Sequence, residues 1–140
     1  MITNEHYYRA LNIMDRVEEL REEKGVSRYE IGKNLKHTGA YYQAFYDACR
    51  TIRVSTLVNF AKALDVSVEY LLTGKNKKPY KDFKVDFKII KENNVKYLPN
   101  RLQVIKGRLK RGVCNNLSVK SLFEFENYYK IPANKLLGEE

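Results

Sequence analysis

Positive charge is the chemical feature that stands out in this sequence, and it is concentrated in one stretch. Residues 75–111 hold thirteen Lys and Arg against three Asp and Glu, whereas residues 1–74 hold ten of each kind. The second half of the chain therefore carries the whole net charge of +9. Such a density of cations attracts polyanions, and it favours nucleic acid over the simpler interpretation of a solvated basic linker.

Part of this charge falls on a segment with helical spacing. Leu102, Ile105 and Leu109 recur at three and four residue steps, which predicts a helix over residues 100–111 that ends at Gly112. The cations of this helix are expected to face largely outward and to contact phosphates: Arg101, Lys106, Arg108, Lys110 and Arg111. The alternative is a solvated face, since charged residues must lie outside a small bundle in any case.

The sequence offers little for catalysis. His6 and His37 are far apart, and no Cys or His pair has the spacing of metal ligands. There is no nucleophile near a base in sequence and no glycine loop that could cradle phosphate. Cys49 and Cys114 are expected to be free thiols, since nothing indicates an oxidising compartment. We therefore expect no enzyme activity, no metal, no cofactor and no small-molecule substrate.

Two short helices at a steep angle are predicted in the stretch from Gly25 to Leu57. Ile31 and Leu35 lie four residues apart and would form the inner side of the first helix. After a short turn, Thr38 is placed to cap a second helix that runs to about Cys49. This second helix is the candidate recognition element of a helix-turn-helix.

Apolar spacing predicts three more helices around this stretch. Residues 3–24 contain no Gly or Pro and fit one long amphipathic helix that stops at Gly25. A fourth helix is predicted to open at Ser55 or Thr56, and a fifth to run over residues 67–74. The positions expected to be buried are Ala10, Ile13, Met14, Val17, Leu20, Val54, Leu57, Val58, Phe60, Ala61, Leu64, Val68, Tyr70, Leu71 and Leu72.

Two segments, RVEELREEKGVSRYEIGKNL and RTIRVSTLVNFAKALDVSVEYLLTGK, resemble the phage-repressor helix-turn-helix family of Cro and lambda repressor, also called XRE. The resemblance covers about half of the chain. It implies a five-helix DNA-binding domain over residues 1–74, usually a homodimer on a two-fold operator, with its third helix in the major groove.

The resemblance also implies which residues contact DNA. Arg28 falls where family members often have a Gln that touches phosphate. The face that reads base edges would comprise Thr38, Gly39, Ala40, Gln43 and Ala44, with the hydroxyl of Tyr41 as a further polar group. Gly and Ala cannot make the bidentate hydrogen bonds that distinguish bases, so we expect sparse readout. The surrounding cations would position the domain on phosphates: Arg28, Lys33, Lys36, Arg50 and Arg53.

The end of the first half recurs in the second half. One constant shift along the sequence pairs Val119 with Val54, Leu122 with Leu57, Phe125 with Phe60, Leu136 with Leu71 and Leu137 with Leu72. The start of the second half is ambiguous, because residues 83–89 alternate like a strand while Phe83, Phe87 and Ile90 also fit one helical face. The repeat favours the helix. Pro99 and a shorter middle segment argue against a complete second helix-turn-helix.

We therefore expect an all-α protein in three parts. A lambda-repressor-like five-helix bundle would occupy residues 1–74 and a basic linker residues 75–81. A second, smaller and degenerate repressor-like helical bundle would occupy residues 82–140.

The expected function is sequence-specific or semi-specific binding of double-stranded DNA by a cytoplasmic transcriptional regulator, with a homodimer as a possible assembly. No apolar run approaches the roughly 20 residues that span a bilayer, so we expect no membrane association. The alternative is a protein-interaction module, such as an antitoxin-like protein or an assembly factor, whose helix-turn-helix has degenerated and which binds a protein partner.

Overall fold

The structure is a computed structural model that describes residues 4–34, 52–113 and 116–139. Throughout these ranges the regular structure is helical, and the only β-type pairing within them is an isolated bridge, which confirms the all-α prediction for this part of the chain. The helices are α1 (Asn4–Lys24), α2 (Arg28–Asn34), α4 (Val54–Leu64), α5 (Val68–Thr73), α6 (Lys88–Glu92), α7 (Asn100–Lys110), α8 (Val119–Tyr129) and α9 (Ala133–Leu136).

The long first helix forms as its sequence pattern predicts. α1 is a single helix of 21 residues, and Ile13, Met14, Val17 and Leu20 are all buried on one side of it. Gly25 follows with φ 66°, a left-handed conformation that costs glycine little because it has no Cβ atom. The helix therefore stops where the sequence indicates.

Helices α4 and α5 also follow the predicted pattern, with one shift. α4 begins at Val54 rather than at Ser55 or Thr56, because Arg53 takes up the extended N-cap conformation without a side-chain cap. Ser67 caps α5, since its Oγ accepts a hydrogen bond of 3.2 Å from the N–H of Tyr70. Gly74 then ends α5 with φ 78°.

The helix predicted across Phe83, Phe87 and Ile90 is wrong over most of its length. Residues 75–87 form no helix, and α6 covers only the five residues that follow. Instead, Phe83, Val85 and Phe87 pack against the core at alternate positions. The N–H of Asp86, between them, donates a hydrogen bond of 2.9 Å to the carbonyl of Leu137 near the other end of the chain. The alternate burial agrees with the strand-like spacing, but residues 83–87 form neither the predicted helix nor a strand.

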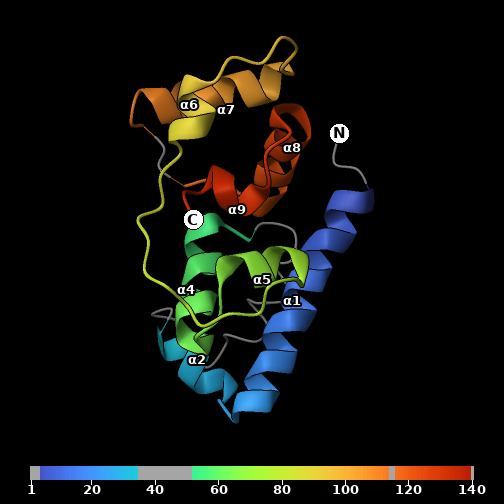
Figure 1. Ribbon diagram of the computed structural model, residues 1–140, viewed down its shortest axis with the longest axis vertical. Helices are drawn as coiled ribbons and strands as arrows, with labels where there is room; N and C mark the ends of the chain where they lie inside the picture. Colours follow the sequence, from blue (N-terminus) through green and yellow to red (C-terminus); the bar gives the residue numbers. More distant parts are fainter. Residues whose placement is uncertain (1–3, 35–51, 114–115, 140) are drawn as a thin grey trace.

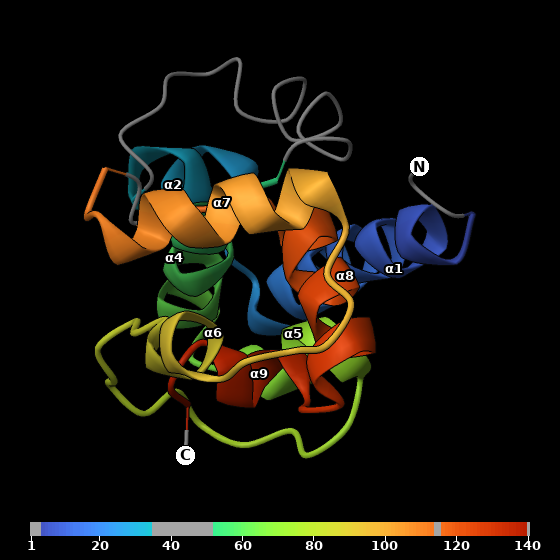
Figure 2. The same cartoon turned by 90° about the horizontal axis from the view of Figure 1, so that it is seen from above.

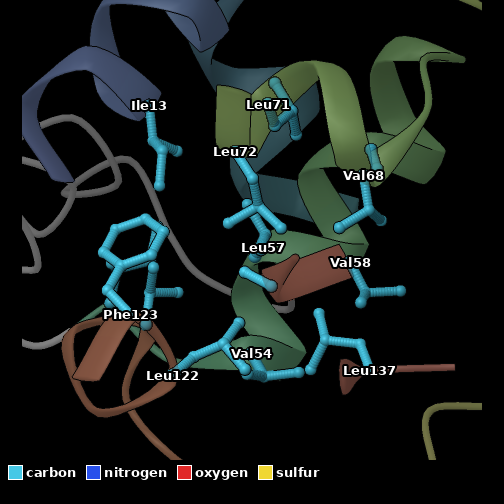
Figure 3. Close-up of a cluster of buried hydrophobic side chains, with 14 of the residues drawn as sticks. Ile13, Val54, Leu57, Val58, Val68, Leu71, Leu72, Leu122, Phe123 and Leu137 are labelled. Carbon is cyan, nitrogen blue, oxygen red and sulfur yellow. The ribbon is translucent and has the colours of Figure 1, made fainter. Parts of the chain in front are cut away.

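The buried apolar residues of both halves form one continuous cluster. Figure 3 shows Val54 of α4 beside Leu122 of α8, and Val58 beside Leu137. α1 packs on α8 as well as on α4 and α5, and α5 packs on α9. Figure 1 shows the resulting order along the molecule, from α2 at one end, through the layer of α4 and α5 and then α8 and α9, to α6 and α7 at the other end.

No helix of the described segments combines the length and the apolar character needed to cross a membrane.

Candidate nucleic-acid interface

Helix α7 is held in place by its apolar side. Leu102 and Leu109 are each 1% exposed, and α7 packs on α6. Pro99 precedes the helix, where its fixed φ suits the turn and its missing N–H costs nothing. Gly112 follows with φ 70°. The predicted helix over residues 100–111 is therefore confirmed to within one residue. Burial of Leu102 and Leu109 sets the orientation of the helix and so determines which residues face outward.

Three exposed cations lie on the outer side of α7 and at its C-cap: Arg108, Lys110 and the C-cap residue Arg111, which together we call the α7 basic face. Val104, Arg108 and Arg111 lie at i, i+4 and i+7, so they form one stripe along the helix, and Val104 is 53% exposed. None of the three cations forms an ion pair with a carboxylate of the described chain. Their positive charge is therefore available to bind an anionic ligand.

The sequence around α7 keeps this potential positive. No Asp or Glu occurs between Glu92 and Glu124. The three cations also lie at the C-terminal end of α7, where the helix dipole is negative and favours positive charge. The interaction of the cations with the dipole stabilises the end of the helix. The negative end of the dipole neutralises only a fraction of one charge, so most of the positive potential remains available to an anion.

Two other cations of α7 are engaged within the protein. Arg101 forms an ion pair with Glu124, and its guanidinium also donates to Ser121 Oγ at 3.3 Å. Lys106, expected to face outward, is half-buried, because its Nζ donates to the carbonyl of Asn93 at 2.7 Å. Burial lowers the pKa of Lys106, and the charge of Lys110 lowers it further. The five predicted phosphate contacts thus separate into three open cations and two that hold the fold.

Of the residues predicted to contact bases or phosphates in the first half, Arg28, Lys33 and Arg53 lie in the described chain, and Lys33 falls within α2. Arg28 opens α2 and is exposed, but its guanidinium donates to Glu18 at 3.3 Å. Arg53 is exposed at the N-terminus of α4. The remaining predicted residues lie outside the described ranges: Lys36, Thr38, Gly39, Ala40, Tyr41, Gln43, Ala44 and Arg50.

Figures 1 and 2 together place α2 and α7 relative to the rest of the molecule. Figure 2 shows α7 and α2 on the side opposite to α5 and α9, and Figure 1 shows them at opposite ends of the long axis. The two helices therefore mark the ends of a single side of the protein.

Two adjoining hollows on the second half were not foreseen from the sequence. They measure about 340 and 690 Å³ and share Lys96, Tyr97 and Tyr128 in their walls. Tyr97 is 75% exposed and Tyr128 40% exposed. Helical spacing gives no signal for Tyr128, because it lies three residues after the buried Phe125 and therefore next to the buried side of α8.

A further cleft of about 670 Å³ lies beside α5 and residues 78–84. Glu139 in its wall is engaged within the protein, because its carboxylate accepts hydrogen bonds of 2.9 Å from the N–H groups of Val68 and Glu69. Across the described residues no group of three or more His, Cys, Asp and Glu side chains could hold a metal ion.

Comparison of the chain with protein-family models, with curated proteins and with solved structures finds no match. What supports a function is therefore the geometry and charge of the chain itself, together with the repressor-like sequence pattern.

Proposed function

We propose that the protein binds double-stranded DNA and acts as a transcriptional regulator of the repressor-like helix-turn-helix type. In this proposal two related helical bundles, residues 1–74 and 82–140, are joined by the linker at residues 75–81. The observation that supports it best is the α7 basic face, with three exposed cations on a helix that has no acidic residue.

An exposed helix of this kind suits the major groove of DNA, which is wide enough to admit an α-helix. Arg108 and Arg111 stand one turn apart on its outer side and could bind guanine edges or successive phosphates. Val104 lies on the same stripe and offers an apolar contact for a thymine methyl group. The helix thus carries groups for both affinity and sequence choice.

The first half would add a second contact to the same DNA. The first bundle's recognition helix would provide Thr38 and Gln43, and Arg53 would provide a phosphate contact. Because α2 and α7 mark the two ends of one side of the molecule, DNA lying along that side would meet both halves.

Selection of bound fragments from random duplex DNA tests binding and sequence choice together. The full chain should enrich a defined set of sequences, and Arg108→Ala should relax the preference at one or two positions. Retention of DNA no better than that of a neutral control protein would refute the proposal.

The exposed tyrosines favour a second candidate function, a protein-interaction module. Tyr97 and Tyr128 line the two adjoining hollows, and tyrosine is enriched at protein interfaces because it combines a large apolar ring with a hydroxyl group. A stoichiometric protein complex that survives high salt and is lost in Tyr97→Ser and Tyr128→Ser variants would support this function over DNA binding.

A further inference from the structure

The two halves of the chain meet at a short seam formed by residues 52–54 and 117–119. The N–H of Val54 donates to the carbonyl of Leu117 at 2.9 Å, and the N–H of Val119 donates to the carbonyl of Ile52 at 2.8 Å. The shift that pairs Val54 with Val119 in the sequence repeat also pairs Ile52 with Leu117. Exchanging the two halves therefore turns one hydrogen bond into the other.

This reciprocity is the signature of a two-fold interface, in which residue i contacts residue j and residue j contacts residue i. At the centre of the seam, Arg53 and Ser118 form an antiparallel bridge, and the same shift pairs these two residues as well. Equivalent residues thus face each other across the seam, as they do on the axis of a symmetric homodimer.

The equivalence extends into the helices on both sides of the seam. α4 and α8 start directly after it, and each has 11 residues. Each ends at a residue with left-handed backbone, Asp65 with φ 50° and Lys130 with φ 58°, and these two residues are equivalent under the same shift. The next helices, α5 and α9, pack against each other. The central layer of the protein therefore has an approximate two-fold relation.

Outside this layer the two halves differ. α1 has 21 residues and crosses from its own half onto α8, where Arg9 bonds to Glu126 at 2.7 Å. The helix that opens the second half, α6, has only five residues and packs on α7 and α9. The end of the molecule that carries α2 therefore differs from the end that carries α6 and α7.

We propose that a single chain pairs its own two halves across this seam, remains a monomer in solution, and binds a bipartite duplex DNA site with two unlike half-sites at one chain per duplex. Val54 and Val119 are 1% and 0% exposed, so the groups that could join two copies are already covered within the chain. A symmetric dimer binds a palindromic operator because each half of the dimer contacts an identical half-site. A chain whose two ends differ should bind two different half-sites. The DNA part rests on the proposed function, whereas the internal pairing rests on the seam alone.

A cysteine pair tests the internal pairing directly. Arg53 and Ser118 are the non-hydrogen-bonded pair of the bridge, for which Cα atoms lie about 4.5 Å apart, within the span of a disulfide. Arg53→Cys and Ser118→Cys would be combined with Cys49→Ser and Cys114→Ser, and each single cysteine serves as a control. Oxidation should give an internal disulfide at the mass of one chain. Disulfide-linked dimers, or no disulfide, would overturn the internal pairing.

Sedimentation equilibrium of the unmodified full chain, alone and with a duplex selected from random DNA, tests the stoichiometry. The inference expects one chain in the free state, one chain per duplex, and a selected site that is not a palindrome. A dimer on a palindromic site would overturn the inference while leaving DNA binding intact. A monomer that forms the internal disulfide but binds no duplex would overturn the proposed function and the DNA part, and it would leave the internal pairing standing.

Discussion

Arg9 of α1 and Glu126 of α8 form a hydrogen-bonded ion pair of 2.7 Å between residues 117 positions apart. The same guanidinium lies 3.7 Å from the centre of the Phe123 ring. The second carboxylate oxygen of Glu126 accepts a hydrogen bond of 2.7 Å from the N–H of Ala133, at the start of α9. One side-chain cluster therefore ties the first helix of the chain to the last two.

Removal of this cation should weaken the whole fold. Arg9→Met should lower the free energy of unfolding by about 1–2 kcal/mol, because it removes a partly buried ion pair and a cation–π contact. Urea unfolding followed by circular dichroism measures the change. Lys77→Met, which removes the exposed ion pair with Glu23, is the matched control and should have the smaller effect. Equal effects for the two variants would contradict the role given to Arg9.

The seam predicts matched effects for two proline substitutions. Val54 and Val119 are the first residues of α4 and α8, where proline fits a helix, and the preceding residues already have the extended backbone that proline requires. Val54→Pro and Val119→Pro each remove one N–H of the seam, so each should cost about 1 kcal/mol for the lost hydrogen bond. Val54→Ala and Val119→Ala keep the N–H and report the loss of packing alone. A large effect at one position and none at the other would argue against reciprocal pairing.

Stability at low pH should depend on Glu18. Burial raises the pKa of Glu18, but the hydrogen bonds and charges of Arg21 and Arg28 outweigh it and hold the pKa below its ordinary value. A carboxyl group with a lowered folded-state pKa stabilises the fold above its unfolded pKa, about 4.3, and this stabilisation is lost as the pH falls through the folded-state pKa. Glu18→Gln should therefore lower the melting temperature at neutral pH, by the equivalent of about 0.2–1 kcal/mol. The difference from the unmodified protein should disappear in strong acid, and a difference that grows in acid would show the opposite linkage.

Sequence periodicity was sufficient for the helices that bury one clear side. The apolar steps of α1 and α4 and the Ser67 and Gly74 signals of α5 place these elements to within one or two residues, because local spacing and burial agree. The repeat also identifies Val119, Leu122 and Phe125, which are buried on α8. The pattern of residues 83–87 fits both a strand and a helix, yet neither forms, because this segment makes tertiary contacts such as the hydrogen bond from the N–H of Asp86 to the carbonyl of Leu137.

The candidate site was only partly predictable for a similar reason. Spacing identified α7 and its exposed cations, but it could not reveal that Arg101 bonds to Glu124 of another helix or that Lys106 reaches the carbonyl of Asn93. These partners lie on other elements, so they depend on the packing of α7 against α6 and α8. The Tyr97 and Tyr128 hollows depend on the same packing.

Two substitutions on α7 compare an exposed cation of the basic face with a cation that is hydrogen-bonded within the protein. Arg108→Ala should weaken DNA binding several-fold at low salt, because its side chain is exposed and unpaired among the described residues. Lys106→Met removes the same charge from the same helix, yet it should change DNA affinity less, because Nζ of Lys106 already bonds within the protein. Fluorescence anisotropy with a labelled duplex measures both variants. A greater loss of affinity for Lys106→Met would exclude the α7 basic face as the contact.

The salt dependence of duplex binding by the full chain tests the proposed function most directly. If Arg108, Lys110 and Arg111 each neutralise a phosphate, the logarithm of the binding constant should fall with the logarithm of salt concentration with a slope of roughly −3 or steeper, about −0.9 for each phosphate. Replacement of all three by alanine should flatten the slope by a similar amount. A slope near zero for the unmodified protein would contradict DNA binding.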